Sequence, residues 1–406
     1  MIVLSHATGN QFVREALMAF EQANMLEEFW TTLSWNNTGA VNRLLPGSLR
    51  RLFERRSFPK SVREKTHTLP LRETVRLLAG AAGASPQHET GIFSMDAVLR
   101  ELDRKVATRL RKITDCTAVY AYEDGALETF RAAHDLGVNC IYDLPIGYWQ
   151  VGQRLFAEEK EREPEWSCTL TGALDSAEKL SRKDDELRLA NHVVVASTFT
   201  KNTLADAPGA AKIEVIPYGA PRSISAEIRK PAGRLKLLFA GSLGQRKGLS
   251  YLLKAVDKLK DRVELTLLGR KAASGCPALE SAVRKYRWIP TLDHAGVLRQ
   301  MHEHDVLVFP SLFEGFGLVI LEAMAQGTPS ITTNHTAGPD AIEDGADGFI
   351  IPIRSTEAIV EKLELLLADP ERLMSMKAAA KRKADLLKWD NYRRGLVEVA
   401  REVIAR

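Results

Sequence analysis

The sequence predicts an α/β fold with two domains, each built on a parallel sheet. Short β-branched and apolar runs alternate with amphipathic stretches along the whole chain, a pattern typical of parallel strands joined by crossover helices. A length of 406 residues favours two domains, and each half is long enough to bury its own core. Segments rich in proline and glycine at 217–221 and 231–233 separate two series of strands, so we expect the linker there.

The strands of each series are predicted from continuous apolar or β-branched runs. In the first half they are Ile2–Leu4, Phe29–Leu33, Ala118–Tyr122, Cys140–Asp143, Val193–Ala196 and Ile213–Ile216. In the second half they are Leu235–Ala240, Val263–Leu268, Val306–Phe309, Ser330–Thr333 and Phe349–Ile351.

Helices are predicted where apolar residues recur every three or four positions. This spacing follows the first strand directly, at Phe12, Ala16, Phe20 and Ala23. Further helices are expected near Leu249–Leu259, Ala278–Tyr286, Leu292–His302 and Leu318–Gln326, and a last one runs through Val397, Ala400 and Val403. We therefore divide the chain into an N-terminal domain (1–220), a C-terminal domain (221–387) and a terminal helix (388–406).

Composition restricts the class of protein and its compartment. With 45% hydrophobic and 27% charged residues the chain is typical of a soluble globular protein, and a net charge of +4 is too small to indicate nucleic acid binding. Cys116, Cys140, Cys168 and Cys276 are scattered, which predicts reduced thiols rather than zinc ligands or disulfides. The apolar start at 1–4 is too short for a secretory signal, and no apolar stretch is long enough to span a bilayer. A cytoplasmic protein is expected.

The most informative segment follows the predicted strand Val306–Phe309. Residues 310–323 read Pro-Ser-Leu-Phe-Glu-Gly-Phe-Gly-Leu-Val-Ile-Leu-Glu-Ala. The helix in this segment is apolar on nearly every face and is expected to be buried, with Glu322 two turns inside it. A buried carboxylate needs a partner, so we predict that Glu322 either forms a structural salt bridge or accepts hydrogen bonds from adjacent ligand hydroxyls, such as those of a ribose.

A second carboxylate, Glu314, lies eight positions before Glu322, and the turn between them contains Phe316 and Gly317. Glycines at a strand-to-helix turn let the backbone approach a ligand closely. The free N–H groups of Phe316, Gly317 and Leu318 at the helix start favour an anion. One acid outside the helix, one inside it and an anion site between them suit a sugar, a diphosphate and a ribose laid in a row.

A second loop carries positive charge. After the predicted strand Leu235–Ala240 the chain continues with Gly241 and Ser242, and Arg246 and Lys247 then precede a helix. Cations at a helix start oppose its dipole, an unfavourable placement that an anion between them would explain. Because ligands bind at strand ends in parallel sheets, we predict that Arg246 and Lys247 hold a phosphate pair; a solvated helix end is the alternative.

The pattern of Glu, seven residues and Glu, embedded in Pro-Ser-x-x-Glu-Gly-Phe-Gly, resembles the signature of the retaining glycosyltransferases of family GT4, which have the GT-B fold. The resemblance is concentrated from about Leu235 to Leu387. It implies two Rossmann-like domains with parallel sheets that face a central cleft, and a last helix that crosses back to the first domain. It also implies that Glu314 holds sugar hydroxyls, that Glu322 anchors the ribose, and that the base lies near 269–273 and 288–292.

The resembling family commonly carries a Gly-Arg pair where this chain has Gly241-Ser242, so Arg246 is expected to supply the missing guanidinium. The chain contains no Asp-x-Asp triplet and no His/Asp cluster with metal-ligand spacing. The expected site is therefore independent of metals and of cofactors. Arg246, Lys247 and the helix start would take over the role that a magnesium ion plays in many phosphate enzymes.

The N-terminal half provides weaker candidates for substrate contacts. Gly9 and Asn10, after the first strand, are predicted to line the donor phosphate or the acceptor, although an ordinary tight turn explains them equally well. The resembling family often carries a histidine near the reacting carbon in an Asp-x-His segment. The corresponding stretch here contains Asp143 without a histidine, so Asp143 is the candidate, while His6 and His134 stay unassigned.

Two further features of this half have two interpretations each. Glu123 and Asp124 end a strand at the expected cleft edge, where a solvated turn is the common explanation. In the basic segment 48–60, arginines interleave with leucines and phenylalanines. A peripheral contact with an anionic membrane is one hypothesis for it; a solvated helix face, or a loop that grips an acidic acceptor, is the other.

The resemblance as a whole implies an enzyme that moves a sugar from a nucleotide-diphosphate sugar to an acceptor hydroxyl with retention at the anomeric carbon. Two alternatives remain. One is a sugar-nucleotide epimerase of the same fold, which needs no acceptor. The other is a protein that binds sugar nucleotides without turnover, since a fold alone does not establish activity.

Overall fold

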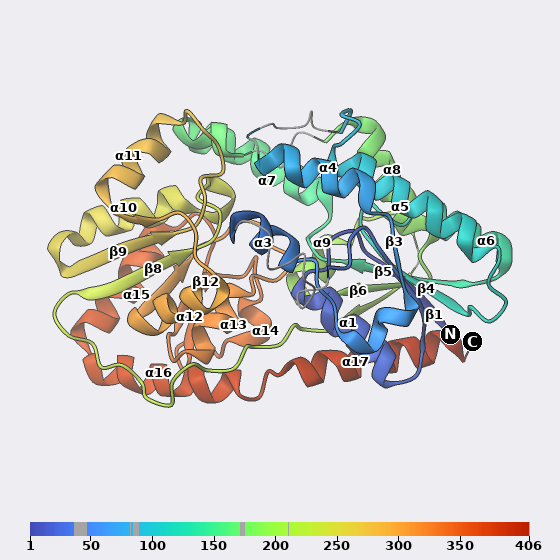
Figure 1. Ribbon diagram of the computed structural model, residues 1–406. Helices are drawn as coiled ribbons and strands as arrows, with labels where there is room; N and C mark the ends of the chain where they lie inside the picture. The colour runs from blue at the N-terminus through green and yellow to red at the C-terminus, as the bar shows by residue number, and fades with distance from the viewer. Residues whose placement is uncertain (36–46, 82, 84–88, 171–174, 210, 406) are drawn as a thin grey trace.

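Two parallel sheets, one in each half of the chain, confirm the predicted fold class (Figure 1). The computed structural model describes residues 1–35, 47–81, 83, 89–170, 175–209 and 211–405. The first sheet contains β1 (Ile2–Ser5), β2 (Leu26–Thr31), β3 (Thr66–Thr68), β4 (Ala118–Tyr122), β5 (Asn139–Leu144), β6 (His192–Val195) and β7 (Lys212–Val215). The second contains β8 (Leu235–Ala240), β9 (Val263–Leu268), β10 (Arg287–Ile289), β11 (Val306–Phe309), β12 (Ser330–Thr333) and β13 (Gly348–Ile351).

The strand order is that of a doubly wound sheet in both domains. It runs β3-β2-β1-β4-β5-β6-β7 in the first sheet and β10-β9-β8-β11-β12-β13 in the second. In each case the chain starts in the middle, winds to one edge and returns past its first strand, so β1 and β4, like β8 and β11, are neighbours at a topological switch point. Loops at the carboxyl ends of the strands bind ligands at such a point.

Helices cover both faces of the sheets. Those of the first domain are α1 (Gln11–Gln22), α3 (Gly47–Glu54), α4 (Pro70–Ala81), α5 (Met95–Leu110), α6 (Leu127–Leu136), α7 (Trp149–Arg162), α8 (Ala177–Leu189) and α9 (Thr198–Thr203), with 3₁₀ turns η1 (Lys60–Lys65) and η2 (Pro164–Thr169). Those that follow are α10 (Leu249–Leu259), α11 (Pro277–Lys285), α12 (His294–Glu303), α13 (Val319–Ala325), α14 (Gly338–Ala341), α15 (Thr356–Ala368), α16 (Pro370–Ala384) and α17 (Trp389–Ile404), with η4 (Gln245–Lys247) and η5 (Lys260–Arg262).

Central strands agree best with the sequence-based prediction. The bounds of β4, β8, β9, β11 and β12 are identical to those predicted, because each of these strands consists mostly of apolar or β-branched residues. β2 lies earlier than the predicted Phe29–Leu33. The prediction missed β3 and β10, which are three-residue edge strands whose side chains are partly exposed and show no apolar run.

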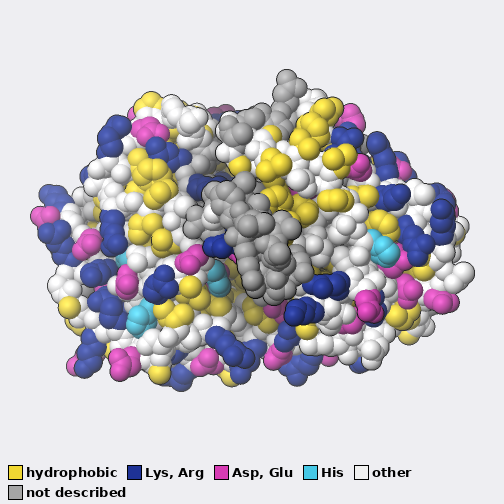
Figure 2. All heavy atoms as spheres, viewed as in Figure 1, with side chains coloured by type: hydrophobic (Ala, Val, Ile, Leu, Met, Phe, Trp, Pro, Cys, Tyr) yellow, Lys and Arg dark blue, Asp and Glu magenta, His cyan; other side chains and the backbone are white. Residues whose placement is uncertain are grey.

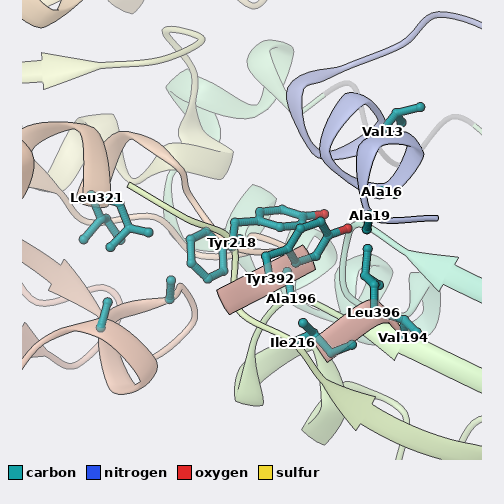
Figure 3. Packing of buried hydrophobic residues seen from close by; sticks show 14 of the residues in the cluster. Val13, Ala16, Ala19, Val194, Ala196, Ile216, Tyr218, Leu321, Tyr392 and Leu396 are labelled. Atoms are coloured by element: carbon teal, nitrogen blue, oxygen red, sulfur yellow. The ribbon is translucent and has the colours of Figure 1, made fainter. Parts of the chain in front are cut away.

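The terminal helix α17 lies against the first domain, although the chain reaches it from the second (Figure 1). Arg393 of α17 pairs with Glu15 of α1 at 2.8 Å, and the Asn139 side chain of β5 donates to the Val403 carbonyl at 3.1 Å. Tyr392 of α17 packs edge-on against Tyr218 of the linker at 5.3 Å between ring centroids (Figure 3). These contacts hold the linker and the tail together; the exact boundaries at 220 and 387 stay a prediction.

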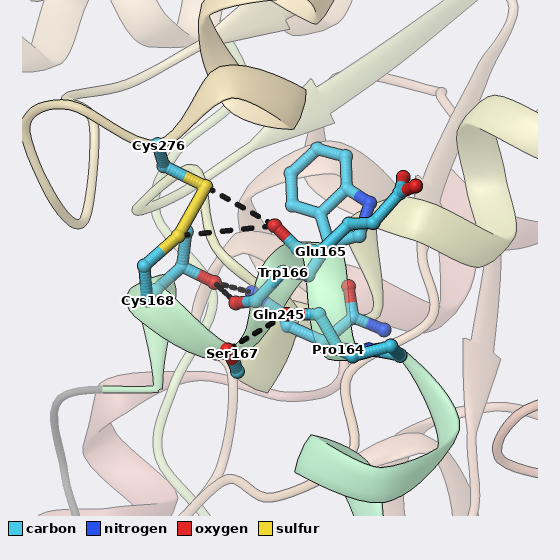
Figure 4. Close-up of a disulfide and its surroundings, with 8 residues drawn as sticks. Pro164, Glu165, Trp166, Ser167, Cys168, Gln245 and Cys276 are labelled. Atoms are coloured by element: carbon cyan, nitrogen blue, oxygen red, sulfur yellow. Dashed lines mark hydrogen bonds between the residues drawn. A yellow bond between two sulfur atoms is a disulfide. The ribbon is translucent and has the colours of Figure 1, made fainter.

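A disulfide joins the two domains at their edge, so the prediction of four unpaired cysteines is wrong for two of them. Cys168 of η2 pairs with Cys276, which directly precedes α11, across a sequence separation of 108 residues (Figure 4). Cys276 is fully buried and Cys168 is exposed. Sequence spacing missed the pair because the cysteines come together only when η2 packs on the second domain. Cys116 and Cys140 are free and buried.

Charges on the visible surface are mixed. Lys and Arg side chains alternate with Asp and Glu across both domains on the face shown in Figure 2. Within the described ranges no helix is both long and apolar enough to cross a bilayer.

Candidate active site between the two sheets

The turn from β11 to α13 contacts loops of the first domain. A Cβ atom at Gly315 would come within 1.7 Å of the Pro145 carbonyl oxygen, so only glycine fits there. The Gly315 carbonyl accepts hydrogen bonds from the hydroxyls of Ser197 at 2.5 Å and Thr200 at 2.9 Å, both at the start of α9. The two domains therefore meet at the residue that follows Glu314.

The predicted cations converge on Glu314. Gly241, with φ +144°, turns the chain after β8 into a conformation that other residues rarely adopt, and η4 then carries Arg246 and Lys247. The Lys247 ammonium and the Arg246 guanidinium both pair with Oε1 of Glu314, the latter at 3.3 Å, and the Ser311 hydroxyl donates to the same atom at 2.8 Å. Glu314 Oε2 has no hydrogen-bond partner among the described residues, so it is free for a ligand.

Burial and neighbouring charges shift the pKa values of Lys247 and Glu314. Burial lowers the pKa of Lys247 to about 8, although the Glu314 carboxylate opposes that shift. Burial alone would raise the pKa of Glu314, but the charges of Lys247 and Arg246 outweigh it and hold that pKa below its ordinary value. At neutral pH the cluster therefore contains two cations and one carboxylate, a net positive charge that suits a phosphate group.

The backbone next to this cluster offers further donors. The amides of Phe316, Gly317 and Leu318 have no acceptor among the described residues, as is usual at a helix start. Phe316 is buried against Tyr218 of the linker, with ring centroids 5.0 Å apart, and Gly317 has φ +86°. In the chain, the two cations precede Glu314 and the three amides follow it. In the structure, both groups lie in loops at the carboxyl ends of strands of the second sheet, the cations after β8 and the amides after β11.

Glu322 has a partner that the sequence analysis did not predict. It lies in the first turn of α13, not two turns inside as predicted, and its side chain is 17% exposed. The His294 ring at the start of α12 contacts Glu322 Oε1 through Nε2 at 3.0 Å. This hydrogen bond raises the pKa of His294. Oε2 of Glu322 has no partner among the described residues. No sequence signal marked His294, because the α12–α13 contact is tertiary.

A cavity of about 100 Å³ adjoins the cations. Its lining comes from both domains: Phe156, Thr169, Leu170, Ser242, Gly244, Arg246, Lys247 and Ala272. Ser242, the position at which the chain departs from the resembling family, is exposed beside it. Thr169 follows the disulfide cysteine Cys168, and its hydroxyl accepts a hydrogen bond from the Gln245 amide at 2.9 Å. The bridge thus lies one residue from the cavity wall.

Gly9, predicted as a substrate contact, instead contacts residues of its own domain. Its amide donates to Nδ1 of His6 at 2.9 Å, and Phe58 occupies the space that a side chain would need. We therefore do not propose Gly9 as a phosphate ligand. Asn10 is exposed at the start of α1 and makes no capping bond. Burial lowers the pKa of His6 to about 3, so its ring is neutral. His134 lies on α6 and contacts the Leu189 carbonyl at 2.9 Å.

Asp143, predicted as a substrate contact, is a core residue. It is 2% exposed and accepts a hydrogen bond from the Tyr120 hydroxyl at 2.6 Å. Burial raises its pKa to about 7. Tyr392 of α17 and Tyr218 of the linker pack together in the core of this domain (Figure 3), and Tyr392 interacts electrostatically with Asp143.

The basic segment 48–60 packs largely on its own domain. Phe53 stacks on Trp35 at 4.8 Å between centroids, Phe58 packs on Phe29 at 4.8 Å, and Arg56 pairs with Glu73 at 2.7 Å. The side chains of 48, 49, 51 and 52 lie outside the described part. The described apolar groups thus face the protein, and the membrane contact stays a hypothesis without support from them.

Sequence comparison assigns the second half of the chain to a known family. Residues 222–383 match the model of the glycosyl transferases group 1 family, and the matched segment contains Arg246, Lys247, Glu314 and Glu322. This segment of the chain, rather than the whole of it, matches the family. It is 30% identical over 247 residues to a D-inositol 3-phosphate glycosyltransferase of Arthrobacter sp. (strain FB24), covering 53% of this chain and 57% of that relative.

A second curated relative gives the same picture. The chain is 30% identical over 254 residues to a glycogen synthase of Mycobacterium tuberculosis, covering 60% of this chain and 58% of the relative. The chain thus spans somewhat over half the length of the curated relatives it matches.

Solved structures show the same architecture over the whole chain. Sucrose-phosphate synthase from Thermosynechococcus elongatus superposes with a TM-score of 0.70 at 18% identity, covering 100% of this chain and 99% of that one. HepE of Anabaena, solved in complex with UDP-glucose, superposes with a TM-score of 0.63 at 14% identity, covering 99% of each chain. At such identities the likeness concerns the fold, and it confirms the predicted GT-B architecture.

Proposed function

We propose that this protein is a retaining, metal-independent glycosyltransferase that uses a nucleoside-diphosphate sugar as donor and a hydroxyl as acceptor. The observation that carries the proposal is the convergence of Arg246 and Lys247 on Oε1 of Glu314, beside the open amides of Phe316 to Leu318. The match of residues 222–383 to the glycosyl transferases group 1 family supports it.

The diphosphate is the part of the donor that this cluster fits. Two cations and a row of free amides meet a doubly charged leaving group, and burial of Lys247 makes its charge act in a medium of low dielectric. A bound phosphate would favour the charged form of Lys247 and return its pKa toward the ordinary value. The positive side chains thus stabilise charge that develops on the diphosphate as the sugar bond loosens.

The two carboxylates would act on either side of the diphosphate. Glu314 uses Oε1 to hold the cations and presents Oε2 to the sugar hydroxyls and to the positive charge on the ring in the transition state. Glu322, oriented by His294, presents Oε2 to the ribose hydroxyls. The acceptor hydroxyl would enter on the face from which the diphosphate leaves and pass its proton to that phosphate, so a dedicated base is not required.

The first experiment is a thermal-shift screen against UDP, GDP and ADP and their sugar conjugates, followed by product analysis of the conjugate that stabilises most. A ligand that binds only the native state stabilises it by RT ln(1 + L/Kd), where L is the free ligand concentration, so at equal concentration the tighter ligand raises the melting temperature more. We expect transfer to a hydroxyl and an anomeric configuration, read by proton NMR, equal to that of the donor.

Two other outcomes would contradict the proposal. Conversion of the free sugar nucleotide without any acceptor would identify an epimerase. Tight nucleotide binding with no transfer to any acceptor in a broad panel would identify a protein without turnover.

A further inference from the structure

A second cavity lies between the domains, next to the one at the phosphate loop. It measures about 130 Å³, and its lining includes Glu123, Trp149, Lys183 and Arg246. Phe156 and Arg246 line both cavities, so the two are adjacent. A ligand in this second cavity would therefore lie beside the group that we propose to hold the donor diphosphate.

A cluster of carboxylates surrounds the first-domain wall of this cavity, and two of its members, Glu123 and Asp175, line the cavity itself. Lys179 of α8 pairs with Asp96, Asp124 and Asp175, and Lys183, one turn later, pairs with Glu123, Asp124 and Asp175. Four carboxylates thus share two ammonium groups. Of the two interpretations that the sequence left open for Glu123 and Asp124, the solvated turn is wrong, because their side chains are only 11% and 20% exposed.

Glu123 is the most weakly paired of these four carboxylates. Its single ion pair, to Lys183, spans 3.6 Å, and its carboxylate has no hydrogen bond from any described residue. Burying a carboxylate without a close hydrogen-bond donor costs free energy. The nearby buried carboxylate of Glu186, by contrast, accepts hydrogen bonds from three backbone N–H groups and from the Tyr142 hydroxyl. Burial raises the pKa of Glu123 to about 7. A ligand hydroxyl in the cavity would supply the hydrogen-bond donor that the Glu123 carboxylate lacks.

The rest of the lining suits a sugar ring. Trp149 and Phe313 border the cavity, and aromatic surfaces of this kind pack on the apolar face of a ring that carries polar groups at its edge. The Trp149 indole N–H is already donated to Asp184 at 2.8 Å, which fixes the side chain in place.

We propose that this cavity is the acceptor subsite and that it takes a sugar ring without phosphate or carboxylate groups, one of whose hydroxyls donates to Glu123. The inference rests on the proposed transfer reaction and adds the class of its acceptor. An anionic acceptor is disfavoured, because both cations that line the cavity already have carboxylate partners: Lys183 pairs with Glu123 and Asp175, and Arg246 pairs with Glu314. This chain should therefore differ from its curated relatives named for D-inositol 3-phosphate.

The test measures binding of glucose, galactose and mannose, and of their 6-phosphates, by saturation-transfer NMR in the presence of the best nucleoside diphosphate from the donor screen. We expect at least one free sugar to bind, and its 6-phosphate to bind at least tenfold more weakly. Tighter binding of a 6-phosphate, or no binding of any free sugar while the nucleotide still binds, overturns the acceptor proposal and leaves the donor site standing.

Glu123→Gln sharpens the test, since it keeps the shape and removes the charge. Loss of a hydrogen bond to a charged acceptor should weaken the sugar about 10- to 100-fold while nucleotide affinity stays unchanged. The matched control is Glu178→Gln on α8, whose side chain is 81% exposed and pairs with Arg100 away from the cavity. The melting temperature separates a ligand role from a structural one: Glu123→Gln should not lower it, whereas loss of a structural ion pair would. Unchanged sugar binding in Glu123→Gln overturns the proposal.

Discussion

The two edges that face each other across the cleft carry opposite charge. On the second domain, Arg246 and Lys247 outnumber the one carboxylate that joins them, Glu314. On the first domain, four carboxylates share Lys179 and Lys183. Both clusters are largely buried, where charges act strongly and are poorly screened. The difference divides the cleft into a side suited to a charged leaving group and a side suited to an uncharged acceptor.

Removal of the cation at the centre of the donor side should have the largest effect. Lys247→Ala takes away a buried ammonium that, in the proposed reaction, stabilises the charge developing on the diphosphate, so turnover should fall by about 10²–10³-fold with a smaller change in nucleotide affinity. Steady-state kinetics measure this. Lys258→Ala, at an exposed ion pair with Glu357 on the outer face, is the control and should leave the rate unchanged. Equal kinetics in both variants would remove Lys247 from the site.

The disulfide is the next test, because it ties the two edges together. Reduction should destabilise the protein by about 2–4 kcal/mol, since the bridge closes a segment of 108 residues. Thermal unfolding with and without a dithiol measures the drop in melting temperature. The double variant Cys168→Ser, Cys276→Ser should show the same drop and no further response to the dithiol. A wild-type protein that does not respond would show that the bridge adds no stability.

On the donor side, Glu322→Ala should weaken nucleotide binding about tenfold or more, because the ribose loses a charged acceptor. His294→Ala should have a smaller effect in the same direction, since His294 orients the carboxylate and is itself 62% exposed. Titration calorimetry with the best nucleotide gives both values. A greater loss in His294→Ala than in Glu322→Ala would reverse the assigned roles.

The smallest effect concerns stability at the acceptor side. The folded pKa of Glu123 is about 7 against an ordinary 4.5, so the folded protein binds more protons than the unfolded chain between these values. The contribution of Glu123 to stability therefore falls as pH rises from about 4.5 to about 7 and remains lower above it. Glu123→Gln removes the free-energy cost of a buried charged carboxylate at high pH. The free energy of unfolding of the variant should exceed that of wild type by about 1 kcal/mol at pH 8 and approach it near pH 4.

Lys183 and Lys179 oppose the shift in the Glu123 pKa, and Asp124 and Asp175 add to it. Denaturant unfolding at the two pH values provides the measurement. A variant less stable than wild type at pH 8 would mean that the Lys183 pair is worth more than the burial of the charge costs, and would weaken the contrast between the two edges.

Sequence patterns predicted the donor side better than the acceptor side. Arg246, Lys247 and Glu314 each lie within two residues of a glycine in a loop that follows a buried strand, so the residue types and their place in the sheet were both visible. On the acceptor side, Glu123 comes from the end of β4, Lys183 from α8 and Trp149 from α7. No short motif contains them. Asp143 was chosen instead because its stretch corresponds to the Asp-x-His segment of the resembling family, but its side chain is buried and paired with Tyr120.

The two parallel sheets, their central strands and the charged residues of the donor loops follow from the amino-acid sequence alone. Local periodicity and turn chemistry are properties of short segments, and they decide those features. Tertiary structure decided which charges meet: Lys247 with Glu314, His294 with Glu322, Cys168 with Cys276, and the carboxylates around Lys183. Such pairs depend on how helices and domains pack, and the free energy of a buried charge is set by those neighbours rather than by its place in the chain.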